Sequence, residues 1–129
     1  MTDVMCVGAH PDDVEIGMGA TVAKMAASGM EVVLVDLTDG EPTPRGTHAT
    51  RMREADASAS TLGVSTRVTL PLVNRELADT VEARTSLAEL VREYRPRLLF
   101  APYPMDAHPD HIAASAIVDA ARFYSKFVK

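Results

Sequence analysis

Two short polar segments hold the residues of this sequence best suited to chemistry. Residues 10–13 read His-Pro-Asp-Asp and residues 108–111 read His-Pro-Asp-His, so the segments share a tripeptide and differ at the fourth position. Three of the four histidines in the chain lie in them. Two imidazoles and one carboxylate, with a position left open for water, form a known catalytic zinc site. We therefore expect His10, Asp13 and His111 to bind Zn²⁺ or another divalent ion such as Fe²⁺.

The other polar residues of the two segments suggest roles around such a metal. A bound metal lowers the pKa of its water, and Asp12 is then free to act as the general base. His108 could protonate a leaving group or stabilise an oxyanion, and Asp110 could hold and polarise a histidine. The alternative for Asp12 and Asp110 is a purely structural N-cap, because an aspartate that follows proline at a helix start often has only that role.

Bulk properties restrict the class of protein. A length of 129 residues fits one domain, spanning residues 1–129. The net charge of −5 disfavours nucleic acid and anionic membranes as partners and favours a small or neutral substrate. No apolar run approaches the ~20 residues that span a bilayer. The lone Cys6 and an N-terminus that does not resemble a signal peptide predict a cytoplasmic location.

Hydrophobic patterning predicts four strands that alternate with four helices. The predicted strands are residues 4–9, 31–38, 67–70 and 98–101, and the predicted helices are residues 14–28, 50–62, 79–95 and a last one from residue 110. The alternation indicates an α/β fold, a Rossmann-like parallel sheet of order 3-2-1-4 with helices on both faces. The first and fourth strands are then neighbours, so we expect residues 10–13 and 108–111 to meet where the winding reverses.

Four local expectations accompany this fold. Asp79, with a glutamate three residues later, resembles a capping box. Residues 71–78 are expected to be irregular, and the apolar stripe of the last helix should bury side chains as far as Val128. Gly17 and Gly19 are expected to let backbone segments pack closely.

Two arginines lie near the loop at residues 39–48, which follows a strand, as functional loops of α/β folds do. Arg45 sits in this loop where a substrate would pass. Arg51 and Glu54 are three positions apart on the next helix, a spacing typical of a surface ion pair. His48 is expected to be solvated or a weak substrate contact.

Taken together, these motifs resemble the PIG-L (LmbE-like) de-N-acetylase family. The resemblance rests on residues 9–13 after the first strand and on residues 106–111, Asp-Ala-His-Pro-Asp-His, after a later one. Further matches are residues 45–47, Arg51 with residues 54–55, and residues 62–64. The resemblance covers nearly the whole chain and extends to the deacetylases of bacillithiol and mycothiol biosynthesis, the bacillithiol type being nearer.

The resemblance implies a zinc-dependent amidohydrolase that removes the acetyl group from an N-acetylglucosamine unit carried on an aglycone. It implies that the zinc ligands are His10, Asp13 and His111. It also implies that Asp12 is the general base and that His108, with Asp110 behind it, helps to stabilise the tetrahedral intermediate. Arg51 matches a position associated with sugar binding, and we group Arg45 with it as a substrate-binding residue.

The sequence departs from the family pattern in two ways. Family members are commonly longer, so we expect this chain to lack the family's C-terminal part. An open sheet edge would expose apolar surface, which predicts a homo-oligomer. In addition, Ala107 stands where the bacillithiol type would carry a larger polar residue, so the resemblance gives less information about the identity of the aglycone.

Two other functions compete with the hydrolase. One is a sugar- or metal-binding module of the same fold that is catalytically incomplete. The other is a nucleotide-binding half-Rossmann domain, which would need a glycine-rich first turn where residues 10–13 stand instead.

Overall fold

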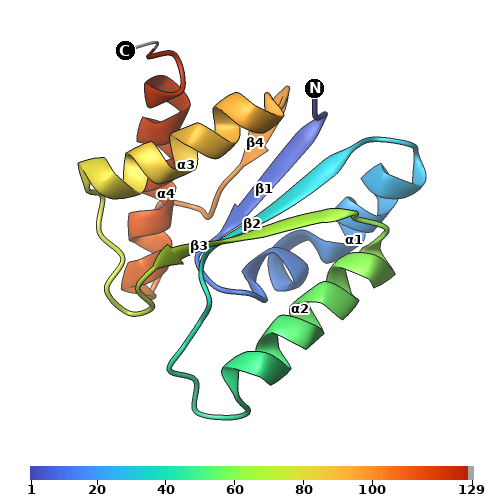
Figure 1. Ribbon diagram of the computed structural model, residues 1–129, viewed down its shortest axis with the longest axis horizontal. Helices are drawn as coiled ribbons and strands as arrows, with labels where there is room; N and C mark the ends of the chain where they lie inside the picture. The colour runs from blue at the N-terminus through green and yellow to red at the C-terminus, as the bar shows by residue number, and fades with distance from the viewer. Residues whose placement is uncertain (128–129) are drawn as a thin grey trace.

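The computed structural model describes residues 1–127, within which four strands alternate with four helices (Figure 1). The predicted burial of Val128 lies outside the described residues. The elements are β1 (Val4–Gly8), α1 (Asp13–Ala27), β2 (Val32–Thr38), α2 (His48–Leu62), β3 (Thr66–Leu72), α3 (Val81–Tyr94), β4 (Leu98–Phe100) and α4 (Pro109–Tyr124).

All strand pairs are parallel, and the sheet order is β3-β2-β1-β4. Val4 of β1 pairs with Val32 of β2 on one side and with Leu98 of β4 on the other. The predicted α/β fold and strand order are therefore confirmed. Because β1 and β4 are adjacent and parallel, their carboxyl ends open at the same edge of the sheet.

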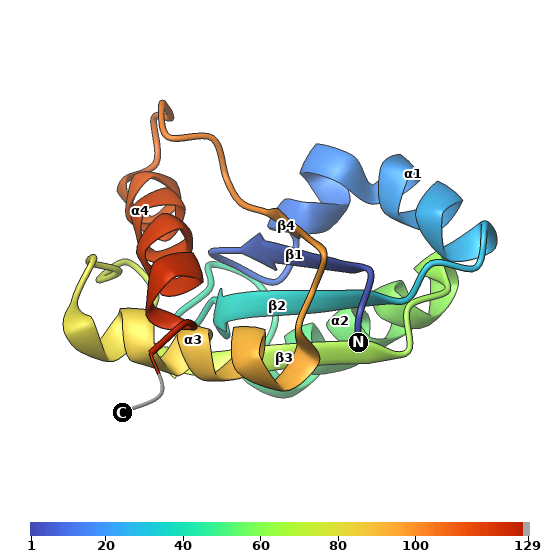
Figure 2. The same ribbon diagram turned by 90° about the horizontal axis from the view of Figure 1, so that it is seen from above.

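The strands carry apolar side chains on both faces, as buried parallel strands do. In β1, Met5 and Val7 face the core beneath α3 and α4, whereas Val4 and Cys6 face the core beneath α1 and α2. Figure 1 shows the resulting three layers, with α3 and α4 on one side of the sheet and α1 and α2 on the other, and Figure 2 shows the strands side by side.

Two expectations about the third strand and helix are wrong. Pro71 belongs to β3, which runs on to Leu72. An edge strand tolerates proline because its outer side needs no ladder hydrogen bond, and a register shift interrupts the pairing here. The N-cap of α3 is Thr80, whose side chain accepts from the N–H of Ala83. Asp79 instead accepts two hydrogen bonds from Arg84, at 2.7 and 2.8 Å.

The expectation that Gly17 and Gly19 permit close backbone packing is also wrong. A Cβ atom built on either residue would have no neighbour within 4 Å in the part of the chain that the structure describes. They flank Met18, whose φ of −152° and ψ of 24° interrupt α1 with a kink. The two glycines therefore face open space on either side of the kink in α1.

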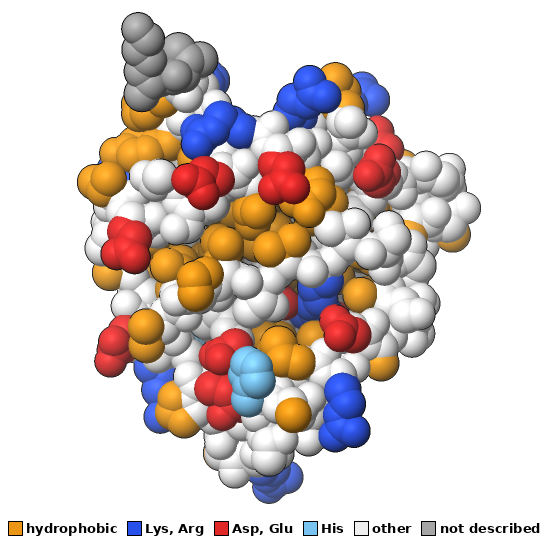
Figure 3. Space-filling model, in the orientation of Figure 1, with side chains coloured by type: hydrophobic (Ala, Val, Ile, Leu, Met, Phe, Trp, Pro, Cys, Tyr) orange, Lys and Arg blue, Asp and Glu red, His pale blue; other side chains and the backbone are white. Residues whose placement is uncertain are grey.

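The surface mixes charges of both signs. On the face seen in Figure 3, acidic and basic side chains are interspersed, with apolar side chains between them. No helix within residues 1–127 is long and apolar enough to cross a membrane.

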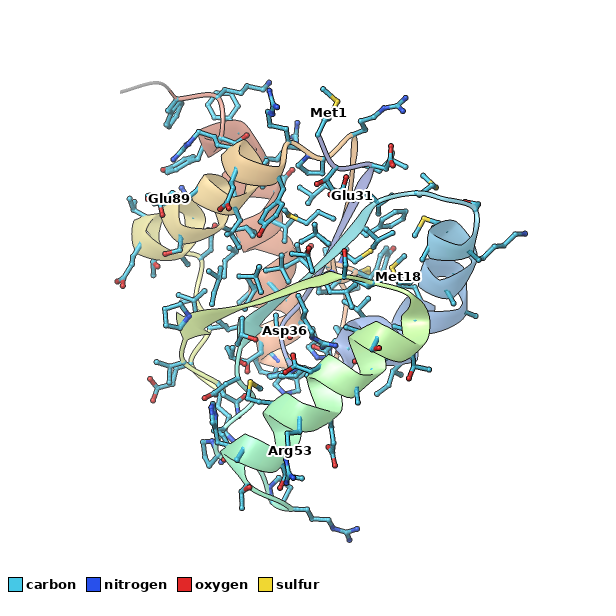
Figure 4. All side chains as sticks on the ribbon, turned by 45° about the vertical axis from the view of Figure 1, so that its right-hand side comes forward. Met1, Met18, Glu31, Asp36, Arg53 and Glu89 are labelled. Atoms are coloured by element: carbon cyan, nitrogen blue, oxygen red, sulfur yellow. The ribbon has the colours of Figure 1, made fainter. Side chains whose placement is uncertain are left out.

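A buried arginine connects the sheet to both helices of one layer. The Arg67 side chain, 4% exposed, donates to both carboxylate oxygens of the fully buried Asp36, at 2.7 and 2.9 Å. It also donates to Glu15 of α1 at 2.8 Å and to the carbonyl oxygen of Ala55 in α2 at 3.2 Å. Figure 4 shows Asp36 at the sheet above α2 and Arg53 on α2 itself.

Arg67→Met should destabilise the protein, because it leaves the buried carboxylate of Asp36 without its counter-charge. We expect the free energy of unfolding in urea to fall by about 3–5 kcal/mol. Arg53→Met is the matched control, since the Arg53 side chain is exposed and contacts Thr50 at the surface, and we expect it to change stability by less than about 0.5 kcal/mol. Equal stability of the two variants would contradict a structural role for Arg67.

Candidate metal centre

The two His-Pro-Asp turns lie together at the carboxyl ends of β1 and β4. His10 follows β1 and Asp13 is the first residue of α1, while His108 is the N-cap of α4 and His111 lies in its first turn. The imidazole centroid of His10 is 4.9 Å from that of His108 and 5.4 Å from that of His111. The rings of His108 and His111 stack at 4.7 Å. The topology thus brings together residues about 100 positions apart, as the predicted strand order requires.

Asp13 lies between two of the histidines. Its Oδ2 atom is 3.2 Å from Nδ1 of His10 and 3.2 Å from Nε2 of His111. The same oxygen accepts the backbone N–H of His10 at 2.8 Å, which fixes the carboxylate within its own turn. Each of the three residues offers one ligand atom, and these atoms lie within 4.8 Å of one another. We call these three residues the His–Asp cluster.

A carboxylate supports each histidine of the cluster from behind. Asp110 is 2.9 Å from Nε2 of His10, and Asp106 is 3.1 Å from Nδ1 of His111. A ring nitrogen that donates to a carboxylate leaves the opposite nitrogen with a free lone pair for a metal. In both rings that opposite nitrogen is the one facing Asp13. The donor set therefore fits a divalent cation.

His10, His108 and Asp110 form a second group with ligand atoms at suitable distances. The carboxylate oxygens of Asp110 already accept the backbone N–H groups of Arg75 at 2.8 Å and Leu77 at 3.2 Å, besides the contact to His10. Asp110 is also only 1% exposed. These bonds occupy the lone pairs that a metal would use, so the His–Asp cluster is the better candidate.

The charges of the centre shift several pKa values. Burial alone would raise the pKa of Asp13, but its hydrogen bonds with His10 and the charges of His10 and His111 lower it overall. The hydrogen bond to Asp13 raises the pKa of His10, against the effect of burial. The centre thus holds an ionised Asp13 between His10 and His111, and a carboxylate in that position suits a divalent cation.

Asp12 is at the N-cap position of α1, yet its side chain makes no capping hydrogen bond within the described residues. It lines a cavity of about 310 Å³ together with His10, Asp13, His108 and His111. Protein atoms packed around its carboxyl group raise the pKa of Asp12, and the charge of Asp13 adds to this, while Arg51 and His10 act in the opposite direction. The purely structural alternative for Asp12 is therefore not supported.

The same cavity, which we call the polar cavity, is completed by residues from the loops after β2 and β3 and from α2: Gly40, Pro42, Thr43, Pro44, Arg51, Asn74 and Arg75. The guanidinium of Arg51 rests against the bare backbone of Gly40, where a Cβ atom would come within 3.0 Å of it. Arg51 is thus placed in the centre with the cluster. Arg45 is exposed and lies outside this lining. His48 is exposed and contacts Asp39 at 3.1 Å.

His108 has a defined protonation pattern. Its Nδ1 atom accepts the backbone N–H of Asp110 at 3.0 Å, so the neutral ring carries its proton on Nε2. The carboxylate of Asp110 faces His10 and not His108. We expected Asp110 to support His108. The backbone N–H of Asp110 does contact His108, but its side chain orients His10 instead.

Two residues that support the candidate metal centre, Asp106 and Arg75, were not predicted from the sequence. Asp106 holds His111 and accepts the backbone N–H of His108 at 2.8 Å. An aspartate two residues before the histidine is typical of a side-chain-bonded turn, which was the available signal. Arg75 has a φ of 70° and turns its N–H toward Asp110. Nothing in the local sequence indicates that contact, because it joins residues 35 apart.

Several known proteins are similar to this chain in sequence. The model of the PIG-L family, described as GlcNAc-PI de-N-acetylase, matches residues 5–122. Diacetylchitobiose deacetylase of Thermococcus kodakarensis is 34% identical over 131 residues, which cover 93% of this chain and 49% of that protein. A 1D-myo-inositol 2-acetamido-2-deoxy-alpha-D-glucopyranoside deacetylase of Catenulispora acidiphila is 34% identical over 148 residues, covering 88% of this chain and 49% of that protein.

A solved structure shows the same fold. The crystal structure of a conserved protein from Thermus thermophilus is 40% identical, with a TM-score of 0.95, over 100% of this chain and 59% of its own. The chain spans about half the length of the curated relatives it matches. A family model that extends from β1 into α4, over both His-Pro-Asp turns, establishes that the chain belongs to the PIG-L (GlcNAc-PI de-N-acetylase) family.

Proposed function

We propose that this protein is a zinc-dependent hydrolase that removes the N-acetyl group from a small N-acetylglucosaminyl substrate. One observation carries the proposal: two imidazoles and a carboxylate converge, each imidazole is supported by a further carboxylate, and Asp12 faces the adjoining polar cavity. That combination is suited to hydrolysis of an amide by water.

His10, Asp13 and His111 would hold the zinc ion. Three protein ligands with an open fourth position are typical of catalytic zinc. Zinc bound there would supply a Lewis acid for the amide carbonyl and lower the pKa of water. Supporting this assignment, Asp110 and Asp106 fix the two rings so that the required nitrogen of each faces Asp13.

Asp12 moves the proton in this proposal. Its carboxylate accepts a proton from the attacking water as the oxygen bonds to the acetyl carbon. The carbon–nitrogen bond then breaks, and the nitrogen takes up a proton as the amine leaves. The products are acetate and a free amine, so one water is consumed and no other reactant is needed.

His108 and Arg51 act on the substrate. His108 carries its proton on Nε2 and lines the polar cavity, so it can donate to the oxyanion of the tetrahedral intermediate. Arg51, placed by Gly40 beside the same cavity, can donate to sugar hydroxyls. Arg45 lies outside the cavity lining, so the proposal assigns it only a peripheral contact with a substrate entering past its loop.

The substrate class rests on relatives and motifs. The curated relatives are named for diacetylchitobiose and for an acetamido-deoxyglucosyl inositol, both of which contain N-acetylated glucosamine. Within that class, the sequence motifs favour a bacillithiol-precursor-like glycoside. The lone Cys6 is buried and free, and this is the basis for including a cytoplasmic location in the proposal.

A catalytically incomplete binding module is the second candidate. The observation that favours it is the donor set itself, because His10, Asp13 and His111 are placed to hold a metal whether or not catalysis follows. Such a module would bind zinc and sugar without releasing acetate.

His111→Ala should abolish stoichiometric zinc binding, because it removes one of three ligands. Elemental analysis after dialysis checks this. His48→Ala is the control, since that imidazole is exposed and pairs with Asp39 outside the His–Asp cluster, and it should retain the wild-type metal content. Unchanged zinc in His111→Ala would refute the ligand assignment.

Asp12→Asn should retain zinc and lose acetate release from diacetylchitobiose by about 10²–10⁴-fold, because the base is removed and the ligands are kept. Asp119→Asn is the control, since that carboxylate is exposed on α4 and pairs only with Arg122. Normal turnover by Asp12→Asn would exclude it as the base. Zinc binding by the unaltered chain with no acetate release would favour the binding module.

A homo-oligomer is expected through the outer edge of β4, where Leu98 is 51% exposed. Leu98→Glu should shift the protein toward monomer in sedimentation velocity at tens of micromolar. Val81→Glu is the control, because Val81 is equally apolar and 64% exposed but lies on α3. A wild-type protein that sediments as a monomer would contradict the expectation.

A further inference from the structure

A second cavity adjoins the His–Asp cluster. It measures about 510 Å³, which is within the range of small-molecule sites. Asp13 and His111 line both this cavity and the polar cavity. The two cavities therefore meet at the cluster.

The second cavity has a different chemical character. Beyond the cluster and Asp106, its walls come from the ends of β1 and β4, the first half of α1 and the segment after β4, and they include Val14, Met18, Phe100 and Tyr103. We call it the apolar cavity. The polar cavity, by contrast, is lined by loops after β2 and β3 and by charged side chains.

The strand order places the cavities on opposite sides of the cluster. The polar cavity lies toward β2 and β3, and the apolar cavity lies toward β4, at the other end of the sheet order. An amide whose carbonyl carbon is held at the cluster has its amine portion on one side and its acyl portion on the other. A sugar in the polar cavity would thus direct the acyl group into the apolar cavity.

We propose that the apolar cavity is an acyl-chain site, so that the protein hydrolyses N-acyl glucosamines with chains longer than acetyl. This inference rests on the proposed function and extends its substrate class. An acetyl group presents a single methyl group, far less than a cavity of about 510 Å³ accommodates. Water adds to the acyl carbon, the carbon–nitrogen bond breaks, and the products are the fatty carboxylate and the amine.

The kink in α1 lies in the wall of the apolar cavity. Met18 leaves helical geometry, and Figure 4 shows it on α1 beside the sheet. Gly17 lines the cavity, and a Cβ atom there would meet no described atom outside its own stretch of α1 within 4 Å. Gly19 has the same open surroundings but is not part of the lining. The two glycines therefore provide a matched pair for testing the site.

The test compares N-acetyl and N-butanoyl derivatives of the same methyl glucosaminide with the zinc-loaded chain. We expect kcat/KM for the butanoyl substrate to equal or exceed that for the acetyl substrate, because each buried methylene contributes roughly fourfold. Gly17→Leu, and Ala101→Leu from the opposite wall, should lower the butanoyl value about tenfold and leave the acetyl value within about twofold. Gly19→Leu should leave both unchanged.

Product binding provides a readout that does not depend on turnover. Isothermal titration should show that butanoate binds more tightly than acetate to the wild type and to Gly19→Leu, and that Gly17→Leu and Ala101→Leu remove the difference. Butanoyl turnover below one-tenth of acetyl turnover, with acetate and butanoate binding alike, overturns the acyl site. Absence of any hydrolysis with a preserved butanoate preference overturns the proposed function and supports the acyl site.

Discussion

The buried carboxylate of Asp110 connects the parts of this structure that must act together. It receives the N–H groups of Arg75 and Leu77 from the loop after β3, and it contacts the ring of His10 after β1. Its own backbone N–H binds His108. The side chain of this one residue at the start of α4 thereby fixes a loop and a candidate ligand, and its backbone N–H holds a neighbouring ring. Burial alone would raise the pKa of Asp110, but the hydrogen bond with His10 and those two backbone donors lower it, so the group is held as an anion.

The meeting of the two turns can be predicted from the sequence, because the residue types of the turns and the apolar runs that define the strands can both be recognised locally. Residues 10–13 and 108–111 are recognisable by type, and apolar runs with helical intervals suffice to derive the order β3-β2-β1-β4. Adjacent parallel strands then require the two turns to meet. The meeting of the two turns needed no further information than this.

What escaped prediction depends on contacts between distant segments. Nothing in the neighbouring sequence predicts the hydrogen bond from Arg75 to Asp110. The same is true of the Arg67 side chain, which binds both Asp36 and Glu15. Pro71 predicts the end of a strand, and only the position of β3 at the edge of the sheet explains why the strand continues through it. Gly17 reads as a packing residue until the kink in α1 shows that nothing packs there.

Gly40 shows how a residue without a side chain can help to position a charged group. The residue has a φ of 75°, and the Arg51 guanidinium occupies the space that a Cβ atom would fill. The position of that cation therefore depends on a residue eleven positions away, which lies between Asp39 and Glu41 in the loop after β2. In evolution, a single codon change at Gly40 would place a side chain against the guanidinium and displace it by a few tenths of an ångström, while every charged residue of the centre stayed the same.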